Sequence, residues 1–152
     1  MTLRDRLQAA LKDAMRAREV DRLSTLRLVN AAIKDREIAL RAEAGEPEVG
    51  DPEILGILGK LVKQRQESAR AFEEGGRLEL AEKELAEVGV IEEFLPRQLS
   101  PEEIEAAVAA AIADLGATGI RDMGRVMAAL KARHTGQMDF GVVGPMVKDR
   151  LG

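Results

Sequence analysis

The fold of this chain is decided by residues 62–100, which read VKQRQESARAFEEGGRLELAEKELAEVGVIEEFLPRQLS. Apolar residues recur every three or four positions on both sides of Gly75-Gly76, a spacing typical of amphipathic helices. The first helix begins upstream of this stretch and ends at the two glycines, and the second covers residues 80–95 and is stopped by Pro96. Because each apolar stripe needs a partner surface, the sequence predicts a helical hairpin.

Two further helices are expected before this hairpin. Thr2 is a suitable N-cap for the first of them, and Asp21 is a suitable N-cap for the second, which runs toward a stop at Gly45. Asp51-Pro52 then predicts the start of the hairpin, with a carboxylate cap followed by a proline at the first helical position, where a missing N–H costs nothing.

Downstream of the hairpin, Ser100-Pro101-Glu102-Glu103 combines a serine cap, a proline at the first helical position and a glutamate at the third, which is the pattern of a capping box. Apolar residues at helical spacing predict three short helices after it. Asp139 is expected to cap the last of these, and Pro145 is expected to kink or restart it.

These elements predict an all-α protein with two domains. The first is an N-terminal helical domain of helical hairpins, residues 1–96, and the second is a small C-terminal three-helix domain, residues 97–152. No segment alternates apolar and polar residues for long enough to predict a strand. The 152-residue chain is 45% hydrophobic, which is enough to bury a core.

Composition excludes several classes of function. The chain has no Trp, no Tyr and three Phe, so base stacking on aromatic side chains is not its main means of recognition. The absence of Cys excludes disulfides, thiolate metal sites and a cysteine nucleophile. With no apolar run suited to a signal peptide or a membrane span, we expect a cytoplasmic protein that does not bind membranes. The net charge of −4 means that any contact with RNA must be local.

Several polar positions match a known family. They are Lys63-Gln64-Arg65, Ser68, Phe72, Gly76-Arg77, residues 79–84 and Phe94-Leu95-Pro96-x-Gln98-Leu99-Ser100, together with Arg22-Leu23-Ser24-x-x-Arg27, Asp122-Met123-Gly124-x-Val126-Met127 and Gly136-x-x-Asp139-x-x-x-Val143. With these residues the whole chain resembles the YqeY family, whose members are similar to the tail domain of GatB, the tRNA-binding subunit of the glutamine-dependent aminoacyl-tRNA amidotransferase. The resemblance implies an RNA-associated helical module with the same two-domain arrangement.

No catalytic constellation is recognisable in the sequence. The stretch Gly56-Ile57-Leu58-Gly59-Lys60 departs from a phosphate-binding loop, and its two glycines are better explained by close helix packing. His134 is the only histidine and is expected to face solvent near a helix end. Most carboxylates lie four residues from a base, as Lys63 with Glu67, Arg70 with Glu74 and Lys83 with Glu87, and describe a solvated helix surface. We therefore predict no catalytic residue, no metal and no cofactor.

A local excess of positive charge gives the candidate RNA contacts. Residues 121–150 contain six basic side chains against three acidic ones, beside a turn at residues 136–141 whose backbone N–H groups could meet a phosphate. The family usually has a basic residue where this chain has Gln137, which can still hydrogen-bond a phosphate or a ribose. The candidate RNA-binding residues are Arg121, Arg125, Lys131, Arg133, Gln137 and Lys148.

Three functional hypotheses follow. The leading one is a non-catalytic module that binds tRNA or a tRNA-enzyme complex, as the resemblance to the GatB tail implies. The alternative is a protein-interaction adaptor, in which the hairpin at residues 51–95 docks on an aminoacyl-tRNA synthetase or an amidotransferase. The third, a component of a carbon-nitrogen ligase with glutamine as amido-N-donor, rests on kinship alone.

Overall fold

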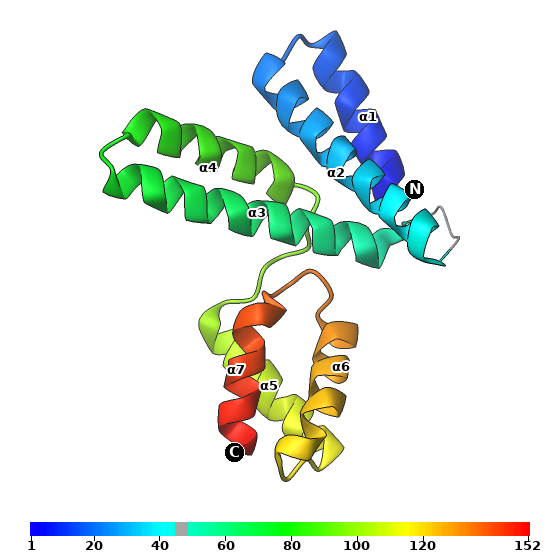
Figure 1. Cartoon of the computed structure of the whole chain (residues 1–152), viewed down its shortest axis with the longest axis vertical. Coiled ribbons are helices and arrows are strands. Elements are labelled where there is room, and N and C mark those ends of the chain that lie inside the picture. The colour runs from blue at the N-terminus through cyan, green and yellow to red at the C-terminus, as the bar shows by residue number, and fades with distance from the viewer. Residues whose placement is uncertain (45–48) are drawn as a thin grey trace. The chain divides into compact units, whose positions relative to one another are not determined.

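The computed structural model describes residues 1–44 and 49–152, and over these residues the chain is all-α and contains no strand, which confirms the predicted fold class (Figure 1). The chain divides into two compact units, unit 1 (Met1–Leu95) and unit 2 (Pro96–Gly152). The helix stop expected at Gly45 lies outside the described residues.

Unit 1 consists of two helical hairpins. The first pairs α1 (Leu3–Arg16) with α2 (Val20–Ala44), and the second pairs α3 (Asp51–Glu74) with α4 (Leu78–Glu92). Figure 1 shows the second hairpin crossing the first. All four helices contribute to one apolar core, whose most deeply buried members include Leu7, Val29, Ile54, Leu58 and Ile91. The α3–α4 hairpin predicted from residues 62–100 is therefore half of a four-helix unit.

The start of α1 is as predicted, whereas the start of α2 is not. Thr2 Oγ1 accepts a hydrogen bond from Asp5 N at 3.1 Å, and the Asp5 carboxylate accepts one from Thr2 N, which lowers the pKa of Asp5. Asp21 does not cap α2, because the helix already begins at Val20 after a tight connection through Arg18, which has a left-handed φ of 57°. Asp21 instead lies in the first turn, where its charge complements the helix dipole.

The boundaries of the second hairpin also differ from the prediction. Gly50 is the N-cap of α3, so Asp51 is the first helical residue, and its carboxylate instead accepts a hydrogen bond from Leu3 N at 3.3 Å. The α4 helix begins two residues earlier than expected and ends at Glu92, well before Pro96. The turn lies at the two glycines as expected, and Gly76 has a φ of 75°, a left-handed conformation that favours glycine.

Unit 2 is a three-helix arrangement of α5 (Pro101–Leu115), α6 (Met123–Arg133) and α7 (Phe140–Leu151), with a short 3-10 helix η1 (Ile120–Asp122) before α6. Its core is separate from that of unit 1 and is formed mainly by Val108, Ala111, Val126, Leu130, Met138, Val143, Val147 and Leu151. The predicted capping box is present, since Ser100 Oγ accepts from Glu103 N at 3.2 Å and Glu103 Oε1 accepts from Ser100 N at 3.0 Å.

The start of α7 is predicted correctly, but the restart that Pro145 was expected to cause does not occur. Asp139 is the N-cap, and its carboxylate accepts a hydrogen bond from Gly141 N at 2.9 Å. Pro145 neither interrupts nor restarts the helix, which is continuous from Phe140 to Leu151. The loss of one backbone hydrogen bond is offset by the burial of Val143 and Val147, because tertiary packing supplies most helix stability.

Candidate nucleic-acid interface

The six predicted RNA-binding residues lie at two separate ends of α6. Arg121 is on η1 and Arg125 is in the first turn of α6, whereas Lys131 and Arg133 are in its last turn. The 11 residues of α6 span roughly 16 Å, so the two pairs are too far apart to form one compact patch. The structure therefore divides the six predicted residues between two sites. We call them the η1 end, with Arg121, Arg125 and Lys148, and the turn end, with Lys131, Arg133 and Gln137.

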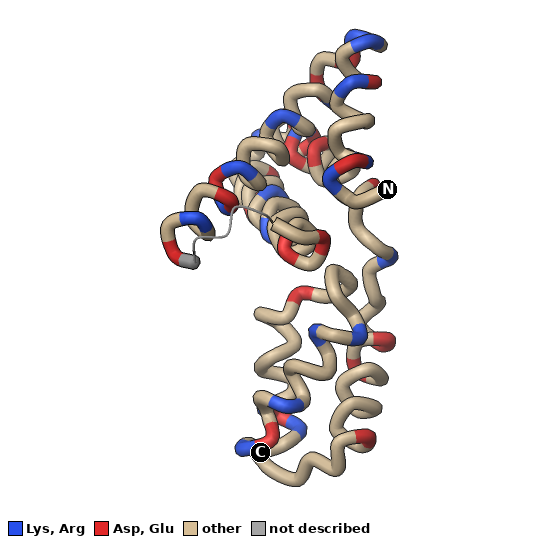
Figure 2. Tube along the Cα trace, turned by 90° about the vertical axis from the view of Figure 1, so that its right-hand side faces the viewer, with Lys and Arg blue, Asp and Glu red and all other residues tan. Residues whose placement is uncertain are grey.

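Lys148 belongs to the η1 end. A Cβ placed on Gly152 would lie 3.4 Å from Ile120 Cδ1, and one placed on Gly144 would lie 3.9 Å from Met123 Cε. Lys148 is midway between these two glycines, four residues from each, and so is on the side of α7 that faces η1 and α6. Figure 2 shows Lys and Arg segments, with acidic segments among them, at the end of unit 2 that carries the C-terminus.

An acidic residue reduces the charge of the η1 end. Asp122 Oδ1 accepts a hydrogen bond from Arg125 Nη2 at 3.0 Å, and its Oδ2 accepts from Thr118 N at 3.0 Å. The hydrogen bond from the Thr118 backbone, together with that from Arg125, lowers the pKa of Asp122. Asp122 is therefore ionised and neutralises Arg125, whereas Arg121 and Lys148 form no ion pair with any residue that the structure describes.

At the turn end most polar groups already have partners. Arg133 forms an ion pair with Asp114 at 3.0 Å. Gln137 Nε2 donates to Arg97 O at 3.1 Å, and Gln137 Oε1 lies 3.1 Å from His134 Nδ1. His134 is thus half-buried in this network and does not simply face solvent as predicted. The side chain of Gln137 holds the chain before α5 against the turn, which is a structural role.

Charge is distributed very unevenly between unit 2 and the two hairpins of unit 1. Unit 2 has seven basic and seven acidic residues, so it has no net charge. Within unit 1, residues 1–44 have ten basic and seven acidic residues, a net of +3, whereas residues 49–95 have six basic and eleven acidic ones, a net of −5. The α1–α2 hairpin is therefore the most basic part of the chain, although none of the six predicted RNA-binding residues belongs to it.

The α3–α4 hairpin is held by a nearly buried ion pair. Arg65 Nε donates to Glu87 Oε2 at 2.9 Å, and Arg65 Nη1 donates to Leu61 O at 3.2 Å. The prediction that Glu87 pairs with Lys83 on its own helix is wrong, because Glu87 points across the hairpin instead. The match of Arg65 to the family pattern is thereby explained by a role in joining the two helices.

Family-matching residues from distant stretches meet in a groove of about 480 Å³ between α2 and α4. Arg22 and Ser24 line it from α2, and Glu79, Glu82 and Lys83 line it from α4. Arg22 also donates to Glu93 at 2.5 Å, and this hydrogen bond raises the pKa of the guanidinium. The groove has charges of both signs and no recognisable catalytic group.

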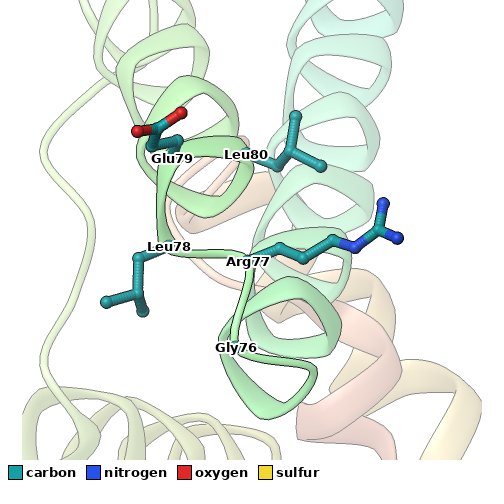
Figure 3. A pocket seen from close by; sticks show the side chains of 5 residues that line it. All are labelled: Gly76, Arg77, Leu78, Glu79 and Leu80. Carbon is teal, nitrogen blue, oxygen red and sulfur yellow. The ribbon is translucent and has the colours of Figure 1, made fainter.

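The tip of the α3–α4 hairpin carries a second hollow, of about 450 Å³, lined by residues 76–80 (Figure 3). Figure 3 shows Arg77 and Leu78 leaving the turn in opposite directions. Leu78 is 62% exposed and Leu85, one heptad later on α4, is 46% exposed. Both leucines are single exposed side chains on a helix whose exposed charged residues are mostly acidic.

Within the described ranges, no group of three or more acidic or histidine side chains could hold a metal ion. None of the described helices is long and apolar enough to cross a membrane.

The close packing expected at Gly56 and Gly59 is not found, since a Cβ at either position would meet no atom within 4 Å.

The fold defines an all-helical protein of two units with small basic surfaces. A family described as "Yqey-like protein" matches residues 4–151. The chain belongs to this YqeY family, as its sequence motifs indicated.

Relatives in fungi cover most of the chain. A Pyrenophora tritici-repentis protein named "Altered inheritance of mitochondria protein 41, mitochondrial" is 32% identical over 135 residues, which are 84% of this chain and 71% of the relative. A Kluyveromyces lactis protein of the same name is 32% identical over 112 residues, 72% of this chain and 58% of the relative. A Schizosaccharomyces pombe protein, "Uncharacterized protein C22F3.15", is 31% identical over 94 residues, 62% of this chain and 72% of the relative.

These names contradict the predicted cytoplasmic location, because the relatives are described as mitochondrial. The prediction rested on the absence of cysteine and of an apolar leader. The lack of an apolar leader does not argue against a mitochondrial location, because mitochondrial targeting segments are amphipathic and rich in arginine, not apolar.

Proposed function

We propose that this protein is a non-catalytic helical module that binds tRNA, alone or in a complex with a tRNA enzyme. The observation that carries the proposal is the η1 end of unit 2, where Arg121 and Lys148 are exposed and form no ion pair among the described residues. The kinship of the family with the GatB tail supports a tRNA as the ligand.

The contact is expected to be weak and electrostatic. Arg121, Lys148 and the partly neutralised Arg125 offer contacts to about three phosphates, so this end contributes roughly −2.7 to the salt slope. Affinity should then fall roughly 40-fold between about 50 and 200 mM salt.

The test is the affinity of the full chain for a fluorescein-labelled tRNA transcript, measured by fluorescence anisotropy. The variant Arg121→Gln/Lys148→Gln should lose most of the binding, because glutamine removes the charge and keeps helix propensity. The matched control is Lys60→Gln/Arg77→Gln on the acidic hairpin, which changes the net charge equally and should bind as the wild type does. Equal losses in both variants, or no binding by the wild type, would refute this function.

The names of the relatives also bear on the compartment. Since those proteins are described as mitochondrial, we propose a mitochondrial setting for the tRNA contact. Fractionation of cells that make the protein, with marker proteins for each compartment, tests this. Recovery in the cytosolic fraction alone would contradict it.

A second candidate function is an adaptor for an aminoacyl-tRNA synthetase or an amidotransferase. It is supported by the acidic α3–α4 hairpin and by the exposure of Leu78 and Leu85. The variant Leu78→Lys/Leu85→Lys should then lose the enzyme from purified native complexes and keep the affinity for tRNA. Retention of the enzyme by this variant would exclude the hairpin as the docking surface.

A further inference from the structure

A polar groove of about 470 Å³ lies between α1 and α2 of unit 1, far in sequence from the residues assigned above. Its lining includes Arg4 and Gln8 from α1, and Arg27, Asn30, Lys34 and Glu37 from α2. Three of these six side chains are cationic and only one is acidic.

The acidic group and one cation neutralise each other. Arg4 forms an ion pair with Glu37, and Arg4 Nη2 lies 3.5 Å from Val49 O. Beside this pair, Gln8 Nε2 donates to Asn30 Oδ1 at 3.1 Å. The groove therefore has a fixed polar floor, and the Asn30 amide nitrogen takes no part in the bond with Gln8.

Arg27 and Lys34 are the groups left over. Both are exposed, and neither forms an ion pair with any part of the chain that the structure describes. No carboxylate among those residues forms an ion pair with Arg27 or Lys34, so an anionic ligand could bind both without displacing a carboxylate. This distinguishes them from Arg125 and Arg133 in unit 2, each of which has an acidic partner.

The two cations belong to a longer row on α2. Arg27, Lys34 and Arg41 are spaced by seven residues, which places them along nearly the same face of the helix, with a drift of about 20° per step. At 1.5 Å per residue, successive members are roughly 10 Å apart along the axis. A row of this length matches an extended polyanion better than it matches a single small anion.

The surroundings favour an anion as well. The groove lies in the hairpin that has a net charge of +3, and unpaired like charges at its surface raise the local concentration of an anionic ligand. Arg27 is also part of the stretch Arg22-Leu23-Ser24-x-x-Arg27 that matches the family pattern, and its guanidinium makes no hydrogen bond or ion pair within the described residues.

We propose that the α1–α2 groove is a second RNA contact, in which Arg27 and Lys34 bind phosphodiester oxygens of the RNA backbone. The Asn30 amide donates a hydrogen bond to a phosphate or to a ribose 2′-hydroxyl. Contacts of this kind position an RNA without reading its sequence. This inference rests on the proposed function and adds a site in unit 1 to the η1 end of unit 2.

The experiment compares the wild type with Arg27→Gln/Lys34→Gln, using the same labelled tRNA transcript and full-length protein. Loss of two phosphate contacts should lower the magnitude of the salt slope by about 2 and weaken binding roughly 60-fold at about 0.1 M salt. Circular dichroism should show unchanged helical content. The control Lys60→Gln/Arg77→Gln has the same net charge and should keep the wild-type slope.

The outcomes separate the two proposals. If the groove variant keeps the wild-type affinity and slope while Arg121→Gln/Lys148→Gln loses both, the groove is not a contact and the proposed function stands. If the wild type does not bind tRNA, both proposals fail. Vesicles of anionic phosphatidylglycerol serve as a further probe, and binding to them by the wild type but not by Arg27→Gln/Lys34→Gln, without binding to tRNA, would assign the groove to a membrane surface instead.

Discussion

Replacing Arg65 with methionine should destabilise unit 1 by about 2–3 kcal/mol, because the change leaves Glu87 without its charged partner. The side chains of the two residues are 11% and 20% exposed, so neither charge is well hydrated in the folded state. Arg65→Met keeps an apolar stem of similar length and removes two hydrogen bonds, of 2.9 Å to Glu87 and 3.2 Å to Leu61 O. The residual exposure of Glu87 lets water reach it, which keeps the cost below the roughly 3–5 kcal/mol of a fully buried broken pair.

The assay is urea unfolding followed by circular dichroism, with amide hydrogen exchange of α3 and α4 to assign the change to unit 1. Arg70→Met is the matched control, since Arg70 is an exposed residue of the same helix with no ion pair among the described residues, and it should cost less than about 0.5 kcal/mol. The double variant Arg65→Met/Glu87→Leu should recover to within about 1 kcal/mol of the wild type, because replacing both charges leaves none unpaired. A double variant as unstable as the sum of the two single changes would refute the coupling.

Three further outcomes test other parts of the structure. The hydrogen bond from Arg97, with that from the Ser100 backbone, lowers the pKa of Glu103 from 4.5 to about 2, so its stabilising effect is complete above about pH 4.5 and is lost as the pH falls toward 2. Thermal unfolding of Glu103→Gln should accordingly depend less on pH in this interval than that of the wild type, and identical profiles would contradict the assignment. Gly116→Ala should cost about 1 kcal/mol in urea unfolding, because the α5 C-cap has a φ of 61°, and an unchanged midpoint would show that the cap relaxes. The purified protein should release glutamate from glutamine no faster than buffer does, since no activated nucleophile was recognised, and release that is lost on changing Ser68 or Lys63 would establish an enzyme.

The sequence predicted the fold better than it predicted the residues of the candidate site. Local charge counting found Arg121 and Lys148, which the structure leaves exposed at one end of unit 2. It also included Arg133 and Gln137, whose partners Asp114 and Arg97 lie 19 and 40 residues away in the chain. Hydrogen bonds and ion pairs with residues so distant cannot be read from a linear count of charges.

A linear count of charges also missed the basic groove of unit 1. Arg27 and Lys34 are unremarkable in a helix that also contains acids, and the whole chain is acidic. Their proposed role follows from the placement of α1, which brings Arg4 to Glu37, the one acidic side chain that lines the groove among the described residues. A search for cations spaced by seven residues on one helix would have selected them for further study.

The sequence by itself determined the all-α class, the family, the capping of α1, α5 and α7, and the turn at Gly75-Gly76. These features depend on hydrogen bonds and backbone conformations within a few residues, and on a periodicity that any helix must show. Only the tertiary structure decided that Glu87 pairs with Arg65, that the predicted RNA patch divides between two ends of α6, and that an open cationic groove lies between α1 and α2. Such features depend on which side chains meet across helices, and that is set by the packing of the whole core.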